Sequence, residues 1–113
     1  MTNNKVLIVG NGDSESLKRR LETYGYVSFC AGDTEKAMHE YKQHEPRAVV
    51  FDSEFGLRNI ETTSSLIRTH EKSCRQKSNM YVFGNRVMQP GKEIEASYYY
   101  TEVDGLVNSI TGR

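Results

Sequence analysis

The sequence predicts an α/β domain built on a mainly parallel β-sheet. Short apolar runs alternate with segments whose apolar residues recur at helical spacing. Two of the runs, KVLIV at residues 5–9 and RAVVF at residues 47–51, are continuous, which is typical of strands buried on both faces. Helices between such strands cover both faces of the sheet, so five βα units are expected. A length of 113 residues fits one domain.

Turn signals bound the first two βα units. The first strand is expected at residues 5–9, and the first helix follows between Asp13, a natural N-cap, and Gly25, which ends it. A second strand is predicted at residues 26–30, and the second helix ends before Pro46, because proline disfavours a helical residue before it. The inward positions of the two helices are Leu17, Leu21, Tyr24, Ala37, Met38 and Tyr41.

The second half of the chain is less regular. After the strand at 47–51, a third helix is expected to begin near Arg58 or Asn59 and to dissolve in the polar stretch 71–79. Strands are predicted at 80–83 and 97–101, and the connection between them is interrupted by Pro90-Gly91. Its helix should therefore be short or irregular, with at most about two turns. Asp104 is expected to cap the last helix. The inward positions of these helices are Leu57, Ile60, Ile67, Leu106, Val107 and Ile110.

Composition narrows the classes of function. The chain has 15 Lys and Arg residues and 15 Asp and Glu residues, so it has no excess of basic residues. The composition therefore gives no indication that a nucleic acid or an acidic membrane surface is a partner. No apolar segment suits a signal peptide or a membrane span. Cys30 and Cys74 lack metal or redox spacing, which predicts reduced thiols and a cytoplasmic location. His39, His44 and His70 lack ligand spacing and are expected on solvated helix surfaces.

Together these pieces resemble the receiver domain of two-component response regulators over essentially the whole chain. The matching segments are KVLIV, YGY, CAGDTEKAM, RAVVFD and EASYYY, in that order. The resemblance implies a flavodoxin-like (CheY-like) fold with the strand order 2-1-3-4-5. In that family two acids after the first strand hold magnesium, and an aspartate at the end of the third is phosphorylated. A Thr or Ser ends the fourth strand, and a Lys-Pro pair follows the fifth.

This chain keeps the aspartate and departs elsewhere. Asp52 matches the phosphoacceptor, but the acid pair falls on Gly10 and Asn11, the hydroxyl position on Gly84 and the lysine on Glu102. An aspartyl phosphate would face a carboxylate where the family has an ammonium, which reverses the sign of the interaction. The resemblance thus implies a pseudo-receiver, in which the fold is kept and the phosphorylation switch is lost. Neither magnesium nor another cofactor is expected, and no residue is assigned a catalytic role.

Several other interpretations of these residues stay open. Asp52 could cap the loop after its strand through backbone N–H groups, or it could still accept a phosphoryl group. Asp52, Glu54 and Glu102 could form an acidic metal pocket, although solvation of Glu54 explains it more simply. The glycine-rich loop at residues 10–13 could bind a nucleotide or another small ligand, but the third glycine of that fingerprint falls on Glu15, so turn glycines are the favoured interpretation.

Three consecutive tyrosines, Tyr98, Tyr99 and Tyr100, are the most unusual local composition. Neighbours in a strand face opposite sides, so Tyr99 should differ from the other two, and it is the expected exposed contact. Tyrosine suits protein interfaces, although the three could instead cover the sheet. The leading hypothesis is a non-enzymatic phosphorelay module that binds a protein partner, such as a histidine kinase, a downstream effector or a second copy. Its single domain, residues 1–113, could open a longer protein.

Overall fold

Five strands form one parallel sheet in the order β2-β1-β3-β4-β5, which confirms the predicted flavodoxin-like order. This computed structural model describes residues 4–10, 15–74, 78–83, 98–100 and 103–112. The strands are β1 (Lys5–Val9), β2 (Val27–Ala31), β3 (Ala48–Asp52), β4 (Asn79–Phe83) and β5 (Tyr98–Tyr100). The helices are α1 (Glu15–Thr23), α2 (Thr34–His44), α3 (Leu57–Cys74) and α4 (Val103–Thr111), with a short 3-10 helix (Ser53–Phe55) after β3. Every strand end lies within one residue of its prediction.

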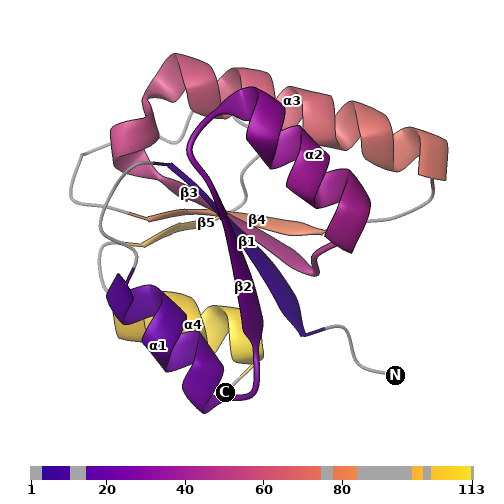
Figure 1. Cartoon of the computed structure of the whole chain (residues 1–113). Coiled ribbons are helices and arrows are strands. Elements are labelled where there is room, and N and C mark those ends of the chain that lie inside the picture. Colours follow the sequence, from indigo (N-terminus) through magenta and orange to yellow (C-terminus); the bar gives the residue numbers. More distant parts are fainter. Residues whose placement is uncertain (1–3, 11–14, 75–77, 84–97, 101–102, 113) are drawn as a thin grey trace.

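The sheet lies between two helical layers, with α2 and α3 on one face and α1 and α4 on the other (Figure 1). Consecutive residues of a strand point to opposite faces, so β1 supplies both layers of the core. Leu7 and Val9 pack on the α2/α3 side, whereas Val6 and Ile8 pack on the α1/α4 side. This two-sided burial explains why the central strands are continuous apolar runs.

Local signals set the ends of α2. Asp33 is its N-cap, and a carboxylate oxygen of Asp33 accepts a 2.7 Å hydrogen bond from the backbone N–H of Lys36. At the other end Glu45 takes a left-handed conformation with φ of 48°, and its N–H donates to the carbonyl of Tyr41. Pro46 follows directly. The predicted end of this helix before the proline is confirmed.

One predicted helix end is confirmed and another was wrong. The third helix was expected to dissolve in the polar stretch 71–79, and α3 ends within it, at Cys74. Glu71 is buried among hydrogen-bond partners, so a polar residue supports the helix here. The last helix begins at Val103, which places Asp104 in its first turn, where it pairs with Arg20 of α1 at 2.7 Å. The expected cap at Asp13 and the connection 84–97 lie outside the described residues.

Candidate functional site

Asp52 ends β3 at the carboxyl edge of the sheet, at the position that the resemblance matches to the phosphoacceptor. Its side chain is half-buried, and Oδ1 accepts a 2.9 Å hydrogen bond from the backbone N–H of Glu54. This contact closes a local turn that leads into the 3-10 helix Ser53–Phe55. The capping role that the sequence left open for Asp52 is therefore present in the structure.

Gly10 lies directly against Asp52. Its backbone adopts φ of +138°, a conformation that L side chains rarely adopt, and its N–H donates to the carbonyl of Ala31 at 2.8 Å. A Cβ atom built at Gly10 would lie 2.6 Å from the Cβ of Asp52 and 3.5 Å from that of Phe55. Neither contact atom sits at the free end of a flexible side chain. The position that the resemblance assigns to the first acid of the pair therefore leaves no room for a side chain.

The other predicted pocket positions can be placed only in part. Glu54 is exposed in the 3-10 helix, next to the turn that Asp52 closes. Asn11, Gly84 and Glu102 lie outside the described residues, as does most of the glycine-rich loop. Within the described part of the chain, no group of three or more His, Cys, Asp or Glu side chains is arranged to hold a metal ion.

The tyrosine run forms β5, as predicted, although its side chains lie outside the described part of the structure. The register pairs Tyr99 with Val82 of β4, and it pairs Tyr98 and Tyr100 with Tyr81 and Phe83. Val82 belongs to the core under α2 and α3, whereas Tyr81 and Phe83 belong to the core over α1 and α4. The backbone positions of the run thus alternate as the sequence predicted.

An open pocket of about 400 Å³ lies next to the carboxyl ends of β2 and β3, on the side of the sheet that α2 covers. Its lining residues are Gly32, Asp33, Thr34, Glu35, Phe55 and Asn59. Several of their polar groups already have partners: Asp33 caps α2, Thr34 bonds Thr63 at 2.8 Å, and Asn59 donates to the carbonyl of Phe55 at 2.8 Å. Two of these lining residues, Asp33 and Glu35, are acidic and none of the six is basic, a set that does not favour a phosphate group.

A buried polar cluster, formed by Tyr41, Arg68, Glu71 and Ser78, lies at the opposite, amino edge of the sheet. The hydroxyl of Tyr41 donates to Glu71 Oε2 at 2.6 Å, and the N–H and hydroxyl of Ser78 donate to the same oxygen at 2.7 and 2.8 Å. Arg68 donates to Glu71 Oε1 at 2.7 Å and to the carbonyl of Ser78 at 2.9 Å. This Glu71 cluster joins α2, α3 and the start of β4.

The hydrogen bonds decide the charge state of Glu71. Burial acts to raise the pKa of this carboxyl, which is only 6% exposed, but donation from Tyr41, Arg68 and Ser78 outweighs burial and holds the pKa below its usual range. The sequence patterns did not predict the Glu71 cluster. A tyrosine at an inward helix position was its one available signal, because a buried phenol hydroxyl requires a partner.

The expectation of solvated histidines was wrong for two of the three. His44 is half-buried and stacks on Phe29 with ring centroids 3.8 Å apart, and its Nε2 lies 3.1 Å from Glu40. His70 is half-buried and meets the ring of Tyr41 edge-on at 5.9 Å. His39 is exposed, as expected. No helix in the described ranges combines the length and apolar character that a membrane crossing requires.

Comparisons with known proteins show similarity in fold to solved structures but no match to a family model or to a curated sequence. The chemotaxis response regulator CheY4 of Vibrio cholerae is similar with a TM-score of 0.77 and 16% identity over 98% of both chains. A CheY-like receiver domain of Methylobacillus flagellatus gives 0.77 and 18%, over 96% of this chain and 99% of that one. One of Methanospirillum hungatei gives 0.76 and 13%, over 98% and 93%. The domain therefore has the CheY-like fold.

Proposed function

We propose that this domain is a cytoplasmic signalling module of the two-component receiver type that acts through protein contacts. It is a pseudo-receiver, in which Asp52 serves the structure and is not phosphorylated by a magnesium-dependent reaction. One observation carries the proposal: Gly10 occupies the first acid position, and its backbone approaches Asp52 so closely that a Cβ there would lie 2.6 Å from the Cβ of Asp52.

The chemistry of phosphoryl transfer explains why this contact matters. Transfer to an aspartate requires a divalent cation that neutralises the charge on the transferred oxygens, and magnesium takes hard oxygen ligands. Gly10 supplies no side-chain oxygen, and an acid introduced there would need the space that Asp52 fills. Asp52 Oδ1 already accepts the N–H of Glu54. Both features favour a structural aspartate over a phosphoacceptor.

The similarity of the fold to CheY-like receivers supports protein binding as the mode of action. We place the contact at β5, the edge strand of the sheet on that side, with Tyr98, Tyr99 and Tyr100 as its residues. A histidine kinase or a downstream effector is the expected class of partner. Tyrosine contributes apolar area and a polar tip with little rotamer entropy, which suits such an interface.

The test is a phosphorylation assay with matched variants. The domain is incubated with magnesium and a small acyl phosphate donor, and its intact mass is measured for wild type, Asp52→Asn and Asp33→Asn. Asp33 is an exposed aspartate that caps α2, so its variant controls for nonspecific acylation. We expect no phosphate adduct in any of the three. An adduct in wild type and Asp33→Asn that disappears in Asp52→Asn would overturn the proposal.

That outcome would establish the second candidate, a divergent receiver phosphorylated on Asp52. The half-buried position of this carboxylate at the carboxyl end of β3 favours it, because that is where a phosphoacceptor would have to lie. The two candidates differ in the need for a cation. A genuine phosphoacceptor would lose its adduct when magnesium is replaced by a chelator.

A further inference from the structure

The outer side of β2, residues Val27–Ala31, forms the sheet edge nearest the viewer in Figure 1, and it is called the β2 edge below. Natural edge strands are usually protected from pairing by charged side chains, proline or a bulge. The sequence of this strand, VSFCA, contains no charge and no proline. Its register with β1 runs through five consecutive pairs, so no bulge interrupts it. Within the described residues, the β2 edge therefore lacks these three kinds of protection.

Two backbone hydrogen bonds at the ends of β2 fix which of its backbone groups face outward. The N–H of Val27 donates to the carbonyl of Asn4, and the carbonyl of Ala31 accepts from the N–H of Gly10, so both residues bond inward toward β1. Alternation along a strand turns Phe29 inward as well. The N–H and C=O groups of Ser28 and Cys30 therefore point away from the sheet, and no described strand lies beyond them.

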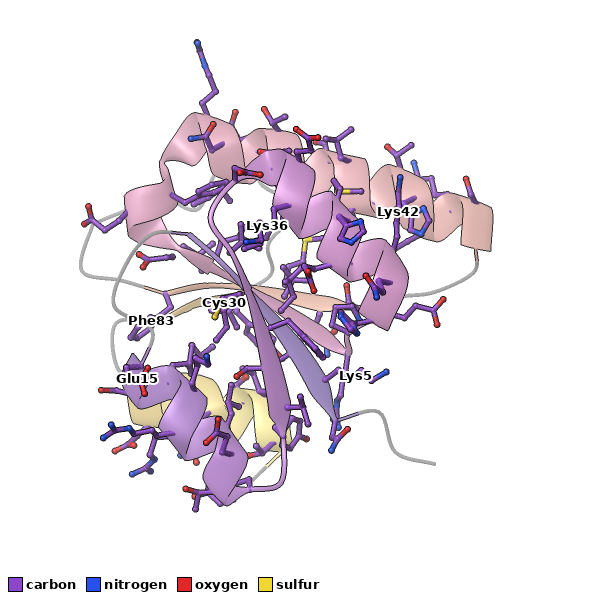
Figure 2. All side chains as sticks on the ribbon, in the orientation of Figure 1. Lys5, Glu15, Cys30, Lys36, Lys42 and Phe83 are labelled. Atoms are coloured by element: carbon purple, nitrogen blue, oxygen red, sulfur yellow. The ribbon has the colours of Figure 1, made fainter. Side chains whose placement is uncertain are left out.

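Side chains along the β2 edge are apolar or small. Val27 is 48% exposed, and Cys30 is exposed with a free thiol (labelled in Figure 2). Ser28 adds an unusual feature, because its hydroxyl oxygen is buried and has no hydrogen-bond partner among the described residues. Unpaired backbone groups, exposed apolar area and an unsatisfied hydroxyl thus coincide on one strand.

We propose that the β2 edge pairs with the β2 edge of a second copy of this chain, in antiparallel orientation about a two-fold axis at Phe29. This register places Ser28 opposite Cys30 of the second copy, and Cys30 opposite its Ser28. Both are then hydrogen-bonded pairs, in which opposite residues exchange their N–H and C=O groups. Phe29 faces its own equivalent at the axis. Every outward backbone group of the strand is satisfied.

A second copy fits the edge better than a charged partner does. A two-fold interface is self-complementary, and this register satisfies that condition with one five-residue strand. Like charges opposite each other destabilise a strand pair, but this strand has none to oppose. The whole chain has a formal net charge of zero, so two copies meet without net repulsion. The interface is separate from β5 and does not depend on the state of Asp52.

Sedimentation of charge variants tests the surface. Val27→Lys introduces a charge at the β2 edge, whereas Leu66→Lys introduces the same charge on α3, where Leu66 is 43% exposed. We expect a wild-type dimer with a dissociation constant below about 1 mM, weakened at least about tenfold by Val27→Lys and unchanged by Leu66→Lys. Circular dichroism confirms the fold of each variant. A wild type that stays monomeric to about 1 mM, or equal weakening by both variants, would overturn the proposal.

Cross-linking tests the register. In Ser28→Cys, the new thiol lies opposite Cys30 of the second copy at the Cα separation of about 5.5 Å typical of a hydrogen-bonded pair, which a disulfide can span. We expect oxidation to give a covalent dimer, with the new cysteine joined to Cys30, and mass spectrometry of its peptides to identify that bond. Adding Cys30→Ser should abolish it. Absence of the covalent dimer, or a bond joining Cys30 to Cys30, contradicts this pairing.

Discussion

The carboxylates at the two ends of the sheet, Asp52 and Glu71, differ in burial and in their hydrogen-bond partners. At the carboxyl end, Asp52 is half-buried and its described hydrogen bond is a local one to the backbone two residues on. At the amino end, Glu71 is buried and accepts four hydrogen bonds from Tyr41, Arg68 and Ser78. Figure 2 shows Phe83 at the first end and Lys5 at the second.

This difference distinguishes the requirements of a phosphorylation site from those of a cluster that stabilises the fold. A phosphoacceptor site needs an accessible carboxylate, together with a cation held by neighbouring oxygens. The described part of the carboxyl end offers tight backbone packing instead, with Gly10 against Asp52. The amino end is rich in polar groups, but they are buried and satisfy one another. The Glu71 cluster thus lies where the receiver resemblance assigns no function, and its hydrogen bonds join α2, α3 and the residue before β4.

The largest loss of stability is expected when a side chain is introduced at Gly10. Gly10→Ala should lower the free energy of unfolding by about 3–5 kcal/mol, because the methyl group would overlap Asp52 and the backbone conformation is strained for alanine. Gly25→Ala is the matched control. Gly25 also has a positive φ, of +82°, but a Cβ there meets no atom within 4 Å. It should cost about 1 kcal/mol. Urea denaturation measures both, and equal losses would contradict the close packing at Asp52.

Removing the central carboxylate of the amino end should have the next largest effect. Glu71→Ala leaves the buried hydroxyls of Tyr41 and Ser78 and the guanidinium of Arg68 without their acceptor. We expect a loss of about 3 kcal/mol in unfolding free energy. Glu22→Ala, at an exposed position of α1, should change it by less than about 0.5 kcal/mol. A Glu71→Ala protein as stable as the Glu22→Ala control would show that the cluster does not stabilise the fold.

The sequence predicted the fold well because the relevant signals are local. Apolar runs identify the strands, and Gly25 and Pro46 mark where helices end. Local patterns do not show the contacts between distant segments. The polar stretch 71–79 indicated where α3 ends, but not that Glu71 is buried and bound by partners on α2 and before β4. Asp104 was wrong as a cap, because it lies inside the first turn of α4, where it pairs with Arg20 on a neighbouring helix.

The position of Asp52 at the end of its strand was predictable from the sequence. The close approach of Gly10 to Asp52 was not predictable. No pattern in the sequence shows that the backbone of Gly10 approaches Asp52, because that distance depends on how β1 and β3 pair in the sheet. The Glu71 cluster joins residues 41, 68, 71 and 78, and its members become neighbours only when α2 and α3 pack on the same face. The histidines were misassigned for the same reason, because their ring partners lie on other elements.

The smallest expected effect is a pH dependence of the unfolding free energy that arises from the ionisation of Glu71 at the amino end of the sheet. Because the pKa of Glu71 is lowered in the folded protein, its ionised form contributes stability at pH values above its unfolded pKa, about 4.3 for a free glutamate. That contribution is lost as the pH falls through the lower folded pKa. Glu71→Gln keeps the packing but removes the charge, so its deficit relative to wild type should be constant from about pH 7 to 5 and should shrink below about pH 4. Denaturation curves at several pH values measure this. A deficit that stays unchanged down to about pH 2.5 would mean that the ionisation of Glu71 does not contribute to stability.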